Sequence, residues 1–182
     1  MAIARIVGLV VAALIAVAAR PADACGYWKM TDVENKFDIG WLINSGEIKT
    51  KAGKRLGTLY LDIEAKDGIR VVTSKKIIYD IKNGRILRYG KPVGTFDPAG
   101  AIAFGSKAYT IEFTDQKPFH DMPSWTMTVK RGDAVIVEST EASALCAVMH
   151  RERDGATMTE AEQQHEIRRR VAYYLAWREF GM

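Results

Sequence analysis

Short apolar segments separated by tight-turn dipeptides fill the chain from about residue 37 to residue 137. Asp67-Gly68 and Asn83-Gly84 each stand between runs rich in β-branched residues. These dipeptides favour two-residue hairpin turns, because both central positions need a positive φ. Over residues 59–64 apolar and polar side chains alternate, which is the period of a half-buried strand. No interval here is long enough for a crossover helix, so the sheet is predicted to be antiparallel.

The remaining strands are predicted from runs of the same kind. Gly132-Asp133 turns the last two of them against each other. Segment 142–150 stays open between two interpretations: its alanines favour a helix, whereas its apolar run 145–149 fits one more buried strand. The strand is preferred, because the polar stretch before it suits a hairpin loop. The other predicted strands cover residues 69–72, 77–81, 86–89, 109–113, 125–129 and 134–138.

Two segments of this region share one sequence pattern. Residues 46–59 and 84–96 both read G-x-I, a short spacer, then G-K, any residue, an apolar residue, G-T and an apolar residue. A partial third copy begins at Gly100. Either the meander simply reuses glycine-punctuated hairpins, or one hairpin unit has been copied around a small barrel or flower-shaped sheet.

The repeated frame, G-x-I followed by G-x-x-V-G, is similar to the unit of the small bacterial five-fold β-flower repeat proteins. The resemblance covers residues 46–105. It implies a flower-like or barrel-like architecture and brings no functional residues to this chain.

A helix is predicted from Glu160 to Phe180. Capping-box frames start at Thr157 and at Thr159, and Arg178 near the other end suits the helix dipole. The predicted fold is therefore mainly β: an antiparallel meander over residues 25–156 that forms a small barrel or flower-like sheet, with a C-terminal amphipathic helix. The helical segment, residues 157–182, is expected to pack on this domain or to extend from it.

The apolar surface of this helix covers well over half of its circumference, which is more than docking on a sheet needs. Ile167, Val171, Tyr174 and Leu175 form one face, and a second face lies beside it. Either the helix covers an open end of the sheet and is buried on two sides, or the second face binds a partner or the lipid–water boundary. The candidate interface residues are Arg170, Tyr173, Trp177 and Phe180.

The N-terminus has the order of a secretory signal peptide. Arg5 precedes an apolar block over residues 6–19, and Ala22-Asp23-Ala24 provides an A-x-A cleavage site before Cys25. The block is too short for a membrane-spanning helix, which needs about 20 apolar residues. Residues 1–24 are thus predicted to be removed, and the mature, soluble protein is expected to be secreted or periplasmic.

The two cysteines leave three possibilities. An exported protein with Cys25 and Cys146 alone most simply pairs them in a disulfide. The alternatives are lipoprotein anchoring at Cys25, where the charged Asp23 fits poorly, and two free thiols.

Sequence motifs for catalysis, metal binding or cofactor binding are not found. Cys146 and His150 are suitably spaced but are too few for a metal site, which needs three or four ligands. The formal net charge of +4 is read as a mild excess spread along the chain, without the stripe that nucleic-acid binding needs.

Binding is the predicted activity. We expect no enzyme, no metal, no cofactor and no nucleic acid, but a protein or envelope partner. The rival hypothesis is a small secreted hydrolase or a ligand- or glycan-binding protein that uses the loop 117–125, because loops on rigid sheets gather binding functions. Its candidate residues are Phe119, His120, Asp121 and Trp125.

Overall fold

The computed structural model describes residues 28–42, 45–62, 70–119, 122–144 and 157–181. These residues form twelve strands and one helix. The elements are β1 (Trp28–Asp32), β2 (Phe37–Trp41), β3 (Ser45–Thr50), β4 (Arg55–Asp62), β5 (Arg70–Thr73), β6 (Ile78–Lys82), β7 (Arg85–Arg88), β8 (Lys91–Phe96), β9 (Ala101–Phe104), β10 (Lys107–Phe119), β11 (Met122–Arg131), β12 (Ala134–Ala142) and α3 (Glu160–Phe180).

The strands form a closed antiparallel barrel. Each strand pairs with its neighbours in the sequence, and β1 closes the ring by pairing with β12. Thr31 lies opposite Glu138 at this closure, and Asp32 lies opposite Val137. The predicted mainly β fold, with an antiparallel meander that forms a barrel, is confirmed. A closed ring leaves no unpaired sheet edge.

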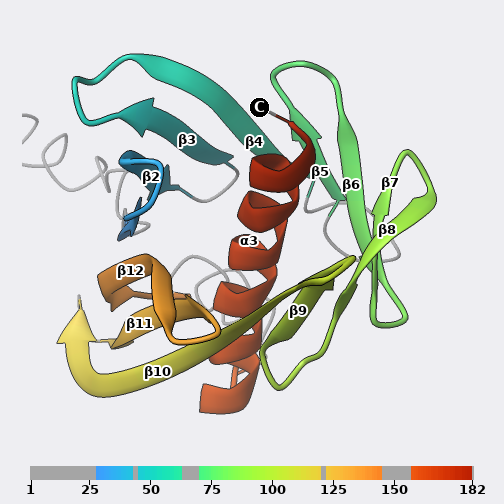
Figure 1. Ribbon diagram of the computed structural model, residues 1–182. Helices are drawn as coiled ribbons and strands as arrows, with labels where there is room; N and C mark the ends of the chain where they lie inside the picture. Colours follow the sequence, from blue (N-terminus) through green and yellow to red (C-terminus); the bar gives the residue numbers. More distant parts are fainter. Residues whose placement is uncertain (1–27, 43–44, 63–69, 120–121, 145–156, 182) are drawn as a thin grey trace, which may run out of the picture.

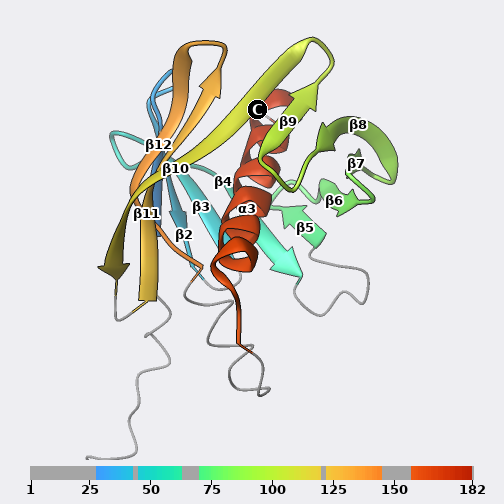
Figure 2. The ribbon, with the colours of Figure 1, turned by 90° about the horizontal axis from the view of Figure 1, so that it is seen from below.

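Helix α3 runs along the inside of the barrel, with the strands around it (Figures 1 and 2). Every residue from Arg170 to Arg178 is buried, so this part of the helix is covered on all sides. A helix that is apolar all round is expected to be surrounded by protein, and here the inward-facing strand residues surround it. Among them are Ile39, Trp41, Ile48, Leu59, Val71, Tyr79, Ile86, Ile102, Met127 and Val129.

The helix begins and ends where the sequence predicts. Thr159 is the N-cap, and it forms a capping box with Glu162. Helix α3 is buried against the β domain, but it lies inside the barrel and is covered on all sides, whereas burial on two sides at an open end of the sheet was expected. The physical reason is the breadth of its apolar surface, which a single sheet face cannot cover. No helix in the described ranges is both long and apolar enough to span a membrane.

The two copies of the repeat fold into the same local structure. The first is the β3–β4 hairpin and the second is the β7–β8 hairpin. Ile48 lies opposite Gly57 in one, and Ile86 lies opposite Gly94 in the other. In both hairpins the register shifts directly after the isoleucine, as at a β-bulge. The repeat is therefore one structural unit used twice within the barrel.

Several predictions fall outside the described residues. The signal peptide, Cys25, Cys146 and the segment 145–156 all lie there, as does the predicted Asp67-Gly68 turn. The Asn83-Gly84 turn is described. Both of its residues have a positive φ, 49° and 71°, as a type I′ hairpin turn requires.

Candidate functional site

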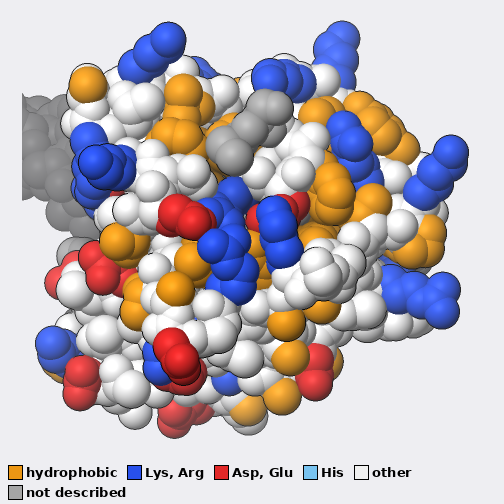
Figure 3. All heavy atoms as spheres, in the orientation of Figure 1, with side chains coloured by type: hydrophobic (Ala, Val, Ile, Leu, Met, Phe, Trp, Pro, Cys, Tyr) orange, Lys and Arg blue, Asp and Glu red, His pale blue; other side chains and the backbone are white. Residues whose placement is uncertain are grey.

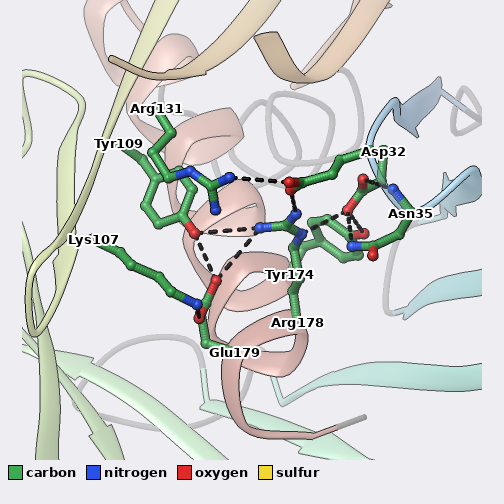
Figure 4. A network of polar contacts seen from close by, with 9 residues as sticks. Asp32, Asn35, Lys107, Tyr109, Arg131, Tyr174, Arg178 and Glu179 are labelled. Carbon is green, nitrogen blue, oxygen red and sulfur yellow. Dashed lines mark hydrogen bonds and ion pairs between the residues drawn. The ribbon is translucent and has the colours of Figure 1, made fainter. Parts of the chain in front are cut away.

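The barrel end at which α3 terminates contains a network of charged and phenolic side chains, the Arg178 network (Figure 4). Arg178 donates from Nε to Asp32 Oδ2 at 2.8 Å and from Nη2 to Glu34. The Tyr174 hydroxyl donates to the same Asp32 oxygen at 2.6 Å, and Asn35 donates to Asp32 from its backbone and from its side chain. Asp32 has no exposed surface and therefore cannot be hydrated. The four donor groups supply the hydrogen bonds that water would otherwise make.

The second half of the network lies nearer the rim of the barrel. The Tyr109 hydroxyl donates to Glu179 Oε1 at 2.6 Å, and Lys107 forms an ion pair with the other oxygen of Glu179. Arg178 Nη1 contacts both the Tyr109 hydroxyl, at 3.3 Å, and Glu179, at 3.4 Å. Arg131 pairs with Glu34 at 3.0 Å. The network thus joins α3 to β1, β10 and β11.

Each charge in the network is stabilised by its neighbours. The hydrogen bond from Arg178 lowers the pKa of Glu34. Burial raises the pKa of Tyr174, and the carboxylate of Asp32 raises it further. Burial alone would lower the pKa of Arg178, but Asp32 and Glu34 outweigh burial and raise it. These groups hold their protonation states firmly, which suits a lock on the helix end better than a proton-transferring site.

The residues expected to form an interface on the helix lie inside the protein. Tyr173 has no exposed surface, Trp177 is 3% exposed, and Arg170 is buried. Arg170 donates to the carbonyl of Leu42 at 3.1 Å. Phe180 is half-buried and packs edge-on against Phe104. In this fold Arg170, Tyr173 and Trp177 are enclosed by the barrel, so these three side chains are not presented to a partner or to a membrane. The reason is the all-round enclosure of α3.

The prediction of a loop at 117–125 is wrong for most of its length, because residues 117–119 and 122–125 form the paired ends of β10 and β11. Trp125 is 3% exposed and packs edge-on against Phe113, so its ring belongs to the core. His120 and Asp121 lie outside the described residues, and the side chain of Phe119 is not described. Of the four predicted ligand-binding residues, the structure describes the side chain of Trp125 alone, and it is not available to a ligand.

The described surface has shallow hollows. One of about 390 Å³ lies beside the Arg178 network, where Lys107 and Glu179 meet the apolar rings of Phe104 and Phe180. Two more, of about 290 and 390 Å³, share Gly84 and Phe96. Within the described ranges, no group of three or more His, Cys, Asp or Glu residues is placed to hold a metal ion.

The outer face of β4 to β7 has a different character. Tyr60 lies opposite Val72, Val72 lies opposite Ile78, and the backbone N–H of Tyr89 donates to the carbonyl of Ile78. We name these four residues the tyrosine row. Tyr60 is 47% exposed and Tyr89 is 56% exposed, and Val72 and Ile78 are half-buried between them. A continuous apolar row of this kind is unusual on the water-facing side of a sheet.

Tyr89 occupies a backbone position that suits it poorly. It stands with Gly90 in the β7–β8 turn, and both residues have a positive φ, 49° and 76°. Asn83 stands at the equivalent position of the neighbouring β6–β7 turn with the same φ of 49°. Asn, Asp and Gly are the residues that this position favours. A tyrosine there therefore costs stability, and its ring is the most exposed large apolar side chain in the described residues.

Positive charge gathers on the same side of the barrel. Residues 45–96, which include β3 to β8, contain twelve Lys and Arg against five Asp and Glu, whereas the rest of the chain after residue 24 contains twelve against sixteen. The excess is therefore concentrated, which corrects the interpretation of a charge spread along the chain. In Figure 3, the upper and right margins carry Lys and Arg without Asp or Glu, whereas both signs are present in the centre, on the left and in the lower half.

Comparison with protein-family models, with curated proteins and with solved structures finds no match for this chain. The tyrosine row is therefore singled out by its exposure and its backbone geometry alone. Sequence reasoning missed it because Tyr89 was assigned to a strand. One signal could have revealed it: a turn-forming Asn-Gly in one hairpin and a Tyr-Gly in the next.

Proposed function

We propose that the protein is an exported component of the bacterial envelope that acts by binding or assembly, without catalysis, and that it binds through the tyrosine row. The signal-peptide pattern of residues 1–24 supports export. The interior supports a surface role, because α3 fills the space that a ligand would occupy in an open barrel. Contacts with a partner are therefore expected on the outer face and at the ends of the barrel.

The observation that carries this proposal is the conformation of Tyr89. A left-handed backbone costs an ordinary L-residue about 1–2 kcal/mol, and the neighbouring turn uses Asn at the same position. Residues held in such conformations cluster at functional sites such as ligand clamps, where the surrounding structure maintains the strain. Its exposed ring, in register with Ile78, Val72 and Tyr60, extends that contact across four strands.

Export is tested with a reporter that folds only after translocation. A fusion to residues 1–30 is expected to be exported, and replacing Ala22 and Ala24 by Arg is expected to block processing. A protein that keeps residues 1–24 and stays in the cytoplasm would refute the localisation. The binding surface would then be tested separately.

Binding is tested with a photo-crosslinking amino acid placed at position 89 of the full-length protein in the host bacterium. The matched control places it at position 140, an exposed residue of β12 on the opposite side of the ring. We expect one discrete covalent adduct from position 89 and none from position 140. The absence of an adduct at 89, or equal adducts at both positions, would contradict the proposal.

A further inference from the structure

We infer that the partner of the tyrosine row is an acidic polypeptide, whose apolar side chains cover the row and whose carboxylates meet the cations beside it. This inference rests on the proposed function. It adds the chemistry of the partner, which the positions of the charged side chains determine.

Two cations border the row, Arg55 and Lys76. The Arg55 guanidinium lies 3.5 Å from the Tyr60 hydroxyl. The Arg88 guanidinium lies 5.9 Å from the centre of the Tyr89 ring, but Arg88 lies opposite the buried Tyr79 and so belongs to the inner face. The hydroxyl of Tyr89 donates to the carbonyl of Lys76 at 3.3 Å, which brings the β5–β6 turn beside the ring. Lys91, the first residue of β8, lies opposite Arg88 and therefore shares its face of the hairpin, away from the row.

Among the described residues, these two cations have little compensating negative charge. In the part that the structure describes, Arg55 has Glu47 within 3.5 Å, and Glu47 also pairs with Lys49. An ion pair of Lys76 is not found among the described residues. An anionic partner therefore gains Coulomb attraction here without first breaking strong internal pairs, and this attraction speeds its association.

The apolar middle of the row selects among anionic partners. Val72 and Ile78 need apolar atoms opposite them, which a polygalacturonate chain does not provide. Both tyrosine hydroxyls are held at the surface, one by Arg55 and one by Lys76, so the rings lie along the sheet and do not project as anchors for a bilayer. A polypeptide that lies along the surface can place apolar side chains over Val72 and Ile78 and does not need projecting rings.

The dimensions also suit a polypeptide. Three strand spacings separate β4 from β7, which amounts to about 14 Å at 4.7–4.9 Å each. About four residues of an extended chain cover that distance. A short segment with alternating acidic and aromatic or aliphatic residues could therefore place apolar groups on the row and carboxylates at its borders.

The experiment uses the purified mature protein, residues 25–182, and four probes: a random copolymer of Glu and Tyr, polyglutamate, polygalacturonate, and vesicles of phosphatidylglycerol and phosphatidylcholine. Affinities are measured at 50 and 300 mM NaCl. We expect the copolymer to bind at least tenfold more tightly than the other three probes, with an affinity that falls at the higher salt concentration.

Two variants assign the binding to the row. Tyr89→Asn is expected to reduce the affinity for the copolymer to that for polyglutamate. The fold should be retained, because Asn occupies the equivalent turn at position 83, and thermal melting checks this. Lys76→Glu, beside the Tyr89 ring, should weaken copolymer binding at 50 mM NaCl. The matched control Lys117→Glu removes an exposed lysine of β10 and should leave the affinity unchanged.

Equal or tighter binding of the polysaccharide or of the vesicles would overturn the inference, as would copolymer binding that Tyr89→Asn does not change. Self-association of the wild-type protein in sedimentation that Tyr89→Asn abolishes, without copolymer binding, would identify a second copy of the chain as the occupant and would also overturn it. If position 89 still forms an adduct in cells, the proposed function survives any of these results. If position 89 forms none, the proposed function fails as well.

Discussion

Replacing Asp32 by Asn tests whether the Arg178 network locks α3 into the barrel. Asp32 is fully buried and accepts four hydrogen bonds, three of them on Oδ2 from Asn35, Tyr174 and the Arg178 guanidinium. An asparagine retains one acceptor oxygen, places an amide donor where the other was, and removes the charge that faces the buried guanidinium. Removing one partner of a buried ion pair costs about 3–5 kcal/mol. For a chain of this size, that loss lowers the melting temperature by about 6–20 °C.

Chemical denaturation followed by tryptophan fluorescence measures this loss, since Trp177 stacks on Tyr174 with ring centres 6.1 Å apart. The matched control is Glu112→Gln, which breaks an exposed ion pair with Lys130 and should cost less than about 1 kcal/mol. Adding Arg178→Met to Asp32→Asn should cost less than the sum of the two single changes, because the two sites interact. An Asp32→Asn variant as stable as the Glu112→Gln control would refute the role of the network.

Three further predictions concern the core. Gly94→Ala should destabilise the β8–β9 pairing by about 1–3 kcal/mol in denaturation experiments, because the new Cβ would lie 2.5 Å from the carbonyl oxygen of Ala103. Burial raises the pKa of Tyr173 from 10.0 to about 12. Its contribution to stability is complete below pH 10 and should decline between pH 10 and 12 as the unfolded chain ionises, and Tyr173→Phe should reduce that decline in unfolding curves measured against pH. Trp177→Asp should unfold the domain, as circular dichroism would show, because this side chain is buried in the barrel and the carboxylate would lack a partner there.

Local sequence patterns predicted much of the fold. Turn dipeptides such as Asn83-Gly84 specify their own hairpins, and the capping box at Thr159 specifies the start of α3, since both depend on neighbours in the chain. The position of the helix was not predictable in the same way. A broad apolar surface indicates burial on several sides, but whether strands of the same chain or a partner cover it depends on ring closure between β1 and β12, residues more than 100 positions apart.

The candidate site was even less predictable from the sequence than the fold was. The Arg178 network joins Asp32, Tyr109 and Arg178, which are remote in sequence and share no motif. The tyrosine row depends on strand register, because a shift of one residue would turn Val72 inward. The aromatic residues that stand out in the sequence, Trp125 and Trp177, are core residues, since large apolar side chains are more often buried than functional.

The most direct test of the central claim, that the tyrosine row is one continuous binding surface, is the adduct yield from a photo-crosslinking amino acid at position 60 in cells. The yield is compared between the wild-type row and a Tyr89→Asn background. The two positions lie on β4 and after β7, at opposite ends of the row. The account predicts one adduct at position 60 that disappears with Tyr89→Asn while the protein melts at or above its normal temperature. An undiminished adduct in a folded Tyr89→Asn protein would contradict it.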